Sequence, residues 1–171
     1  MKLKFKNLTE VLAFQLEEMY VAEKAIQKAL PRVIRTVSSK KLKIEYKKYL
    51  ENTSDKRLKL KRIFSYLLIQ PIDRKSKVMV KMLDQLQAVA KSKTTGKLKD
   101  SQLLSSLGSI AHYKFSVYGM ARLFADELEL ATVAELLSQI ISWEEETQLT
   151  ITRIALEGLV QEAVTLRGGD S

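Results

Sequence analysis

Apolar residues recur at intervals of three or four along five stretches of the chain, with polar positions between them. This period indicates α-helices with one buried face, and there are few signals for strands. Pro71 ends the second stretch, and Lys91 to Lys97 form a polar loop without apolar periodicity. Asp73 and Asp100 are suited to cap the third and fourth helices, and Pro31 predicts a bend in the first. The predicted helices cover about residues 8–37, 41–69, 73–90, 100–128 and 132–165.

The order of these segments is two long helices, a crossover that holds a short helix and a loop, and two more long helices. This order matches the version of the four-helix bundle that has one long crossover connection. We therefore predict an all-α fold, a ferritin-like four-helix bundle with a short crossover helix. In this prediction residues 1–166 form a single domain, and residues 167–171 form a polar C-terminal tail.

Three of the predicted helices carry an apolar seam that is interrupted by one charged residue near its middle. The interrupting residues are Glu23, Lys114 and Glu144, and Thr147 lies one turn after Glu144. The seams are Leu12, Leu16, Met19, Glu23, Ile26, Leu30, Val33 and Val37; Leu103, Leu107, Ile110, Lys114, Val117, Ala121, Phe124 and Leu128; and Val133, Leu137, Ile140, Glu144, Thr147, Ile151, Ile154 and Gly158. A charge on a seam can reach water when its stem is long, but the route is longest at a helix centre. Because charged side chains are rarely buried without partners, we favour one shared buried site.

The second helix has a less regular apolar face, outlined by Leu42, Tyr46, Leu50, Thr53, Leu60, Phe64 and Leu67. Glu51 and Ser54 lie at the border of this face, three residues apart and on the same side of the helix. They are candidates for the shared site. The spacing alone is equally compatible with an ordinary solvated Glu51 beside Lys47 and Lys48.

Composition narrows the chemistry of such a site. The 171 residues include no cysteine and one histidine, His112, which excludes thiolate ligands, a cysteine nucleophile and any site with two histidines. His112 lies off the seam of its helix, so a surface or packing role is expected for it. Ser54 has no histidine partner within reach on its helix, so the sequence predicts no catalytic triad and no catalytic residue.

The net charge of +9 is unevenly distributed along the chain. Residues 1–100 carry 25 basic and 10 acidic side chains, whereas residues 101–171 carry 4 and 10. This asymmetry is typical of a nucleic-acid or anionic-membrane face, or of basic and acidic segments that lie beside each other. The basic residues surround the second helix without an interleaved aromatic platform, so nucleic acid is not favoured as a partner. No apolar run approaches the roughly 20 residues of a membrane span, so we expect a cytoplasmic protein without a membrane partner.

Four short pieces give the sequence a resemblance to a known family. They are Leu16–Pro31 (LEEMYVAEKAIQKALP), Tyr49–Thr53 (YLENT), His112-Tyr113 with Tyr118-Gly119, and Glu144–Leu149 (EEETQL). Together they resemble the YciE/YciF-type bacterial stress proteins of the ferritin-like superfamily, with similar order and spacing over about residues 8–157. The resemblance implies a homodimer and a pair of metal ions in the bundle centre, held by carboxylates and by a Glu-x-x-His pair on the second helix.

Carried over residue by residue, the resemblance matches Glu23, Glu51 and Glu144 to carboxylate ligands. Ser54 stands where the family has histidine, and Lys114 and Ala111 stand where it has glutamate. Thr147 and Gln148 offer only neutral oxygens. An ammonium repels divalent metal ions and attracts carboxylates, so we predict that Lys114 replaces the metal pair in a buried network with Glu23, Glu51, Ser54, Glu144 and Thr147.

This hypothesis makes the protein a non-catalytic, stress-associated relative of metal proteins, and no cofactor is expected. The first alternative is a low-affinity, mononuclear iron or manganese site formed by Glu23, Glu51 and Glu144, with oxidase or iron-handling chemistry. The second alternative is a basic module that binds nucleic acid or an acidic partner.

Overall fold

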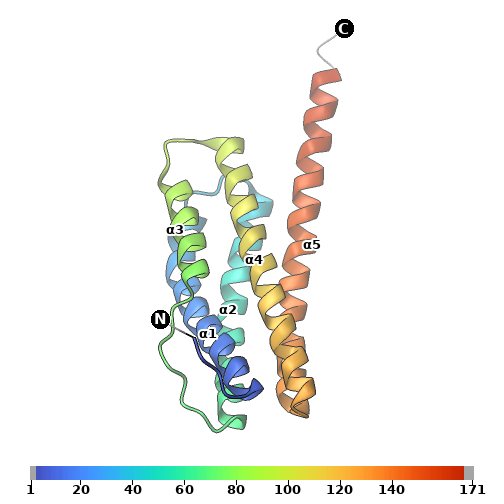
Figure 1. Cartoon of the computed structure of the whole chain (residues 1–171). Coiled ribbons are helices and arrows are strands. Elements are labelled where there is room, and N and C mark those ends of the chain that lie inside the picture. The colour runs from blue at the N-terminus through green and yellow to red at the C-terminus, as the bar shows by residue number, and fades with distance from the viewer. Residues whose placement is uncertain (1–2, 168–171) are drawn as a thin grey trace.

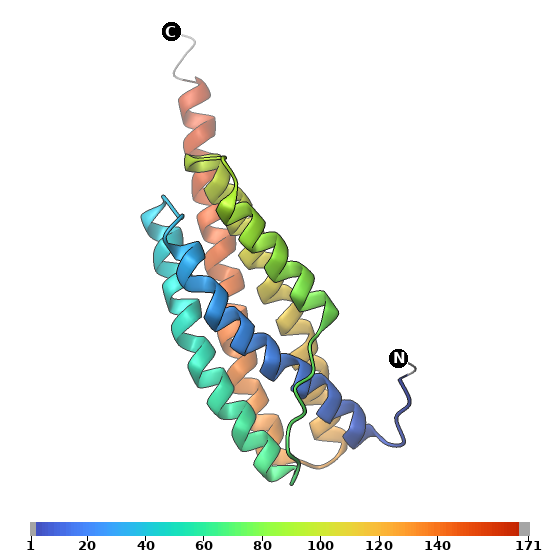
Figure 2. The same cartoon turned by 90° about the vertical axis from the view of Figure 1, so that its left-hand side faces the viewer.

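The computed structural model describes residues 3–167, and the side chains of residues 3–158. Its helices are α1 (Leu8–Ile34), α2 (Lys40–Tyr66), α3 (Lys77–Lys91), α4 (Gly96–Glu127) and α5 (Ala131–Arg167), and these residues contain no strand. Helices α1, α2, α4 and α5 form an antiparallel four-helix bundle (Figure 1). Helix α3 belongs to the crossover and packs along α1 and α4 (Figure 2). The predicted all-α, ferritin-like bundle is therefore confirmed.

The apolar seams form the core, as predicted. All eight seam positions of α1 and the connection after it, from Leu12 to Val37, are buried. On α4 the seam is buried from Leu103 to Lys114 and at Ala121, and the other positions are half-buried. On α5 full burial ends after Thr147, and Ile151 and Ile154 are half-buried beside the beginnings of α2 and α4. Farther along, this helix extends past the bundle (Figure 1).

Four predicted helix boundaries are wrong by three residues or more, namely the ends of α1 and α2 and the beginnings of α3 and α4. Helix α1 continues through Pro31 and ends at Ile34, where Thr36 turns back and donates through its backbone N–H and its hydroxyl to the Val33 carbonyl. Helix α3 begins after Ser76, whose hydroxyl accepts from the backbone of Met79, instead of after Asp73.

Asp100 lies inside α4, which begins at Gly96, and so it is not the predicted cap of that helix. Its two carboxylate oxygens accept hydrogen bonds from the backbone N–H groups of Ser38 (2.9 Å) and Ser39 (2.7 Å). These donors belong to the turn between α1 and α2. Asp100 therefore fixes that turn against the first part of α4.

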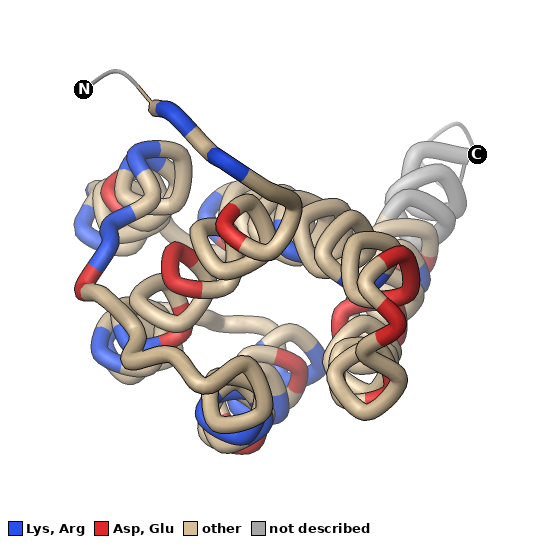
Figure 3. The backbone as a smooth tube through the Cα atoms, turned by 60° about the horizontal axis from the view of Figure 1, so that its bottom comes forward, with Lys and Arg blue, Asp and Glu red and all other residues tan. Residues whose placement is uncertain are grey.

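The uneven charge has a local explanation within the described bundle. Helix α2 lies beside α5, and Lys41 and Lys48 of α2 pair with Glu157 and Glu146 of α5. Figure 3 shows how basic and acidic positions are distributed over the helices. The basic first part and the acidic last part of the chain thus lie against each other within one bundle, which was one of the two interpretations of the charge pattern.

Of the predicted tail, Arg167 is the last residue of α5, and residues 168–171 lie outside the described part of the chain. No helix among the described residues is both long enough and apolar enough to cross a membrane.

Candidate functional site

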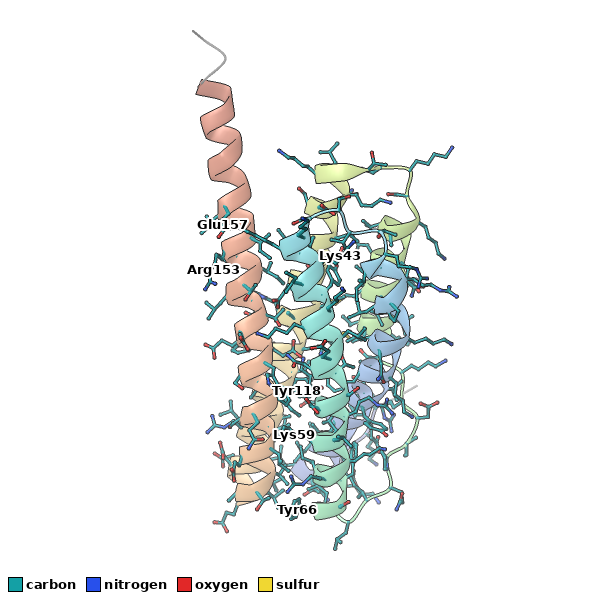
Figure 4. The ribbon with its side chains drawn as sticks, turned by 180° about the vertical axis from the view of Figure 1, so that it is seen from behind. Lys43, Lys59, Tyr66, Tyr118, Arg153 and Glu157 are labelled. Atoms are coloured by element: carbon teal, nitrogen blue, oxygen red, sulfur yellow. The ribbon has the colours of Figure 1, made fainter. Side chains whose placement is uncertain are left out.

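A cluster of buried charged and phenolic side chains occupies the middle of the bundle. We call it the central cluster, and its members are Glu23 of α1, Tyr49 and Lys56 of α2, Lys114 and Tyr118 of α4, and Glu144 of α5. Each member is completely buried. Every long helix of the bundle contributes to the cluster, whereas α3 contributes nothing. Figure 4 shows Tyr118 at this level, between the ends of the bundle.

The ammonium group of Lys114 is the hub of the cluster. Its Nζ lies 2.7 Å from Oε1 of Glu23 and 2.7 Å from Oε1 of Glu144. It also donates to the hydroxyl of Tyr49 at 3.0 Å. Lys114 therefore forms ion pairs with carboxylates of two different helices and a hydrogen bond with a phenol of a third.

A second ammonium shares one of these acceptors. The Nζ of Lys56 donates to Oε1 of Glu144 at 2.6 Å. The two lysines also flank the ring of Tyr49, with Nζ atoms 4.4 Å (Lys56) and 4.8 Å (Lys114) from its centroid. The electron-rich ring face attracts both cations. Two lysines and two glutamates give the cluster a formal charge of zero.

Each of the two tyrosines donates a hydrogen bond to one of the two carboxylates. Tyr49 donates to Oε2 of Glu144 at 2.9 Å, and Tyr118 donates to Oε1 of Glu23 at 2.8 Å. Oε2 of Glu23 has no hydrogen-bond partner among the described residues. Burial raises the pKa of both phenols well above its usual value, and the adjacent carboxylates add to this effect. Both tyrosines are therefore neutral hydrogen-bond donors at physiological pH.

The pKa of each charged group follows from its neighbours. Burial alone would raise the pKa of Glu144, but Lys114 and Lys56 outweigh burial and lower it. Burial alone would lower the pKa of Lys114, but Glu144 and Glu23 outweigh burial and raise it. Lys56 differs, because burial and then repulsion from Lys114 lower its pKa despite the contact with Glu144. The central cluster thus stabilises one ammonium strongly and tolerates a second.

The structure brings together part of the predicted site. Glu23, Lys114 and Glu144 are members of the central cluster, and Thr147 is buried one turn after Glu144. Glu51 and Ser54 are exposed and lie outside it, so their predicted place in the network is wrong. Glu51 is two residues from both Tyr49 and Thr53, and 100° per residue turns it to the opposite side of α2. Ser54 instead accepts a hydrogen bond from Gln27 near the surface.

Sequence reasoning missed Lys56, the role of Tyr49 and a further buried acid, Glu45. Burial raises the pKa of Glu45, against the opposing effect of a hydrogen bond with Thr147. Oε1 of Glu45 has no hydrogen-bond partner among the described residues. Seven of the nine buried residues of α2 form a seam: Leu42, Tyr46, Tyr49, Thr53, Lys56, Leu60 and Ile63. Their intervals alternate between four and three residues, the same pattern that revealed the other three seams.

The sequence matches a family described as "Domain of unknown function (DUF892)" over residues 7–165, nearly the whole chain. The chain belongs to this family. Protein YciF of Escherichia coli (strain K12) is 24% identical over 170 residues, which cover 92% of this chain and 96% of YciF. The predicted resemblance to YciF-type proteins is thereby confirmed.

Two solved structures share the DUF892 chain's fold. The crystal structure of the E. coli stress protein YciF matches with a TM-score of 0.87 and 22% identity, covering 91% of this chain and 98% of the other. YcfI from Rhodopseudomonas palustris matches with a TM-score of 0.83 and 20% identity, covering 89% and 97%. The fold is thus the ferritin-like helical bundle of YciF.

The residues of the central cluster do not fit a pair of divalent metal ions. Such a pair needs several anionic oxygens together with imidazoles. The cluster has two carboxylates, each already in contact with an ammonium, and the single histidine, His112, is exposed. Among the side chains of residues 3–158, no three histidine, aspartate or glutamate groups are placed to hold a metal ion. The chemistry this donor set supports is a closed network of ion pairs that joins four helices.

Proposed function

We propose that this protein is a non-catalytic member of its family, in which a network of lysine, glutamate and tyrosine replaces the di-metal centre of ferritin-like proteins. The observation that supports the proposal is the position of Lys114, whose Nζ lies 2.7 Å from a carboxylate of α1 and 2.7 Å from a carboxylate of α5. In a di-metal bundle, metal ions join carboxylates of different helices. Here the ammonium group of Lys114 joins the carboxylates of α1 and α5, and Lys56 of α2 contacts the second of them.

Electrostatics indicates that the lysines replace the metal ions and do not bind beside them. At about 4 Å and an effective dielectric constant near 20, a pair of unit charges interacts by roughly 4 kcal/mol. A divalent ion beside Glu23 and Glu144 would be repelled by two ammonium groups at comparable distances. Metal entry therefore requires deprotonation or displacement of the lysines. The raised pKa of Lys114 opposes its deprotonation.

The proposed biological role is a structural one in the stress response. The relative with 24% identity is described as a stress protein. A bundle without redox-active metal would contribute to such a response through its surface. The expected homodimer and the cytoplasmic location belong to this proposal. Light scattering of the purified protein measures the first, and fractionation of cells that express a tagged chain measures the second.

A weak mononuclear metal site is the second candidate, favoured by one observation. Oε2 of Glu23 is buried without a hydrogen-bond partner among the described residues, so it is available to a water molecule or a cation. Glu51 is exposed and supplies no ligand to this position. A single cation bound there would have to displace the ammonium of Lys114 from the same carboxylate.

Calorimetric titration with Fe²⁺ under anaerobic conditions and with Mn²⁺ tests the proposal. We expect no stoichiometric binding to the unmodified protein. The variant Lys114→Glu removes the hub cation and adds a carboxylate, so it should gain measurable metal affinity. Lys61→Glu is the matched control, because it makes the same charge change at an exposed position of α2. Tight binding by the unmodified protein would contradict the proposal, and so would identical isotherms for Lys114→Glu and Lys61→Glu.

A further inference from the structure

The residue that follows α2 has an unfavourable backbone conformation. Leu68 has a φ of 55°, in the left-handed region. The backbone N–H of Ile69 donates to the Phe64 carbonyl at 3.1 Å, and that of Leu68 donates to the Ser65 carbonyl at 3.2 Å. These bonds define a helix-ending turn that strongly prefers glycine at the left-handed position, because any Cβ is crowded there. Glu129 has a similar φ after α4, but its polar side chain is well suited to water.

The side chain of Leu68 is also in an unfavourable environment, because it is apolar and exposed to water. It is 92% exposed, and in the same stretch of chain Ile72 is 60% exposed and Tyr66 is 52% exposed. Figure 4 shows Tyr66 at the end of α2, at one extremity of the bundle. Leu68 therefore neither relaxes the turn nor contributes to the core. A leucine at this position does not stabilise the isolated bundle. We therefore look for a binding partner that its side chain contacts.

Basic residues surround these exposed apolar side chains. Lys61 and Arg62 precede them, Lys75 and Lys77 follow them, and none of the four forms an ion pair among the described side chains. The acidic residue between them is Asp73. The connection between α2 and α3 thus presents apolar tips within a positive rim.

The N-terminal arm extends the same surface. Phe5 packs edge-on against Phe14, with 5.3 Å between the ring centroids. The guanidinium of Arg74 lies over the ring of Phe14, 4.5 Å from its centroid. The arm carries Lys4 and Lys6 (Figure 3), and the exposed Leu3. Glu17 anchors the connection below this arm by accepting from the backbone of Ile72 and from Arg74.

We propose that the connection between α2 and α3 docks on the surface of an anionic lipid bilayer, with the side chain of Leu68 inserted among the lipid headgroups. Apolar tips that project from a basic rim match an interface that is fluid, apolar below and negatively charged above. A rigid protein partner would need a pocket shaped for each tip, whereas a lipid surface does not. This contact needs no spanning helix, which was the only ground for expecting no membrane partner.

The contact is confined to one side of this end of the bundle. The end of α4 and the turn that follows it lie at the same end (Figures 1 and 2), and this acidic turn carries Asp126, Glu127 and Glu129. Anionic lipids repel this acidic turn. The bilayer therefore meets the α2–α3 connection and the N-terminal arm while the acidic turn stays in water.

Co-sedimentation of the full chain with vesicles tests the inference. Vesicles of phosphatidylcholine with phosphatidylserine should bind the protein, vesicles of phosphatidylcholine alone should not, and added salt should weaken the binding. Leu68→Gly should weaken the partition by about tenfold or more, because it removes a full apolar side chain. The same variant should unfold at an equal or higher urea concentration, because glycine relaxes the left-handed turn. Loss of binding therefore cannot come from loss of folding.

Two controls and two contrary results complete the test. Leu149→Ala shortens another exposed leucine, in the middle of α5, and should leave binding unchanged. Lys61→Gln with Arg62→Gln should weaken binding to the anionic vesicles, whereas Lys43→Gln at the opposite end of α2 should not (Figure 4). The inference is wrong if the unmodified protein binds neither kind of vesicle. This includes the case in which it instead binds single-stranded DNA and slows its migration in a gel. It is equally wrong if Leu68→Gly and Leu149→Ala bind alike.

Discussion

Lys56 and Lys114 contact the same oxygen, Oε1 of Glu144, at 2.6 Å and 2.7 Å, yet their pKa values move in opposite directions. Burial disfavours the charge of both. Lys114 also contacts Glu23, and its two carboxylates outweigh burial, whereas Lys56 has one carboxylate and faces the charge of Lys114. The central cluster therefore depends on its two lysines unequally.

This inequality predicts different costs for the same substitution. Lys114→Met leaves Glu23 without its ammonium and should lower the free energy of unfolding by about 3–5 kcal/mol, as expected when one partner of a buried ion pair is removed. Lys56→Met removes the less favoured charge and leaves Glu144 paired with Lys114, so it should cost markedly less. Urea unfolding at neutral pH measures both values. Equal losses, or a larger loss for Lys56→Met, would contradict the assigned roles.

The hydroxyl of Tyr49 joins Lys114 to Glu144, accepting from the first and donating to the second. Tyr49→Phe keeps the ring and removes both hydrogen bonds, so it should cost about 1.5–3 kcal/mol, the range for hydrogen bonds to charged groups. Tyr66→Phe serves as the control, because Tyr66 is exposed and outside the cluster. A neutral effect of Tyr49→Phe in thermal or urea unfolding would show that the hydroxyl is dispensable.

Replacing Glu45 by glutamine should raise the free energy of unfolding by an amount that depends on pH. Burial raises its pKa in the folded state, so the folded protein holds the proton to higher pH than the unfolded chain does. This group therefore lowers the stability of the folded state as pH rises from the unfolded pKa, about 4.3, through the folded value. Glu45→Gln should unfold at higher urea concentration than the unmodified protein at neutral pH. The difference should vanish below pH 4, and a difference that is constant across this pH range would refute the assignment.

Asp100 predicts a structural cost far from the central cluster. Asp100→Ala removes both acceptors for the backbone N–H groups of Ser38 and Ser39, and should lower the free energy of unfolding by about 1–3 kcal/mol. Asp84→Ala is the matched control, because Asp84 is exposed on α3. Similar values for the two variants would show that the turn between α1 and α2 does not depend on Asp100.

The fold could be predicted because its determinants are periodic. The seams of α1, α4 and α5 repeat over many turns, so a single charge such as Glu23 does not obscure the pattern. Helix ends depend instead on single hydrogen bonds. Asp73 and Asp100 have suitable side chains for caps, but Ser76 bonds the first turn of α3, and Asp100 bonds another segment of the chain. The bonds of Asp100 to a distant segment leave no local signal, whereas the Ser76 cap is a local alternative to a cap at Asp73.

The members of the central cluster on α1, α4 and α5 could be predicted from the sequence, but those on α2 were not predicted. The positions of Glu23, Lys114 and Glu144 followed from the interrupted seams. On α2 both the incompletely recognised apolar face and the family resemblance directed attention to Glu51 and Ser54, which lie on the other side of the helix. The rule of alternating four- and three-residue intervals identifies Lys56 as the single charge on the α2 seam. A strict periodicity, applied to α2 as it was to the other three helices, would therefore have located the fourth part of the site.

The central claim is that ammonium groups occupy the place of metal ions, and elemental analysis tests it most directly. The full chain is purified from cells grown with added iron and manganese, without chelators, and its metal content is measured by mass spectrometry together with protein concentration. The account predicts transition metal far below one ion per chain. About two ions per chain, the content of a di-metal bundle, would contradict it.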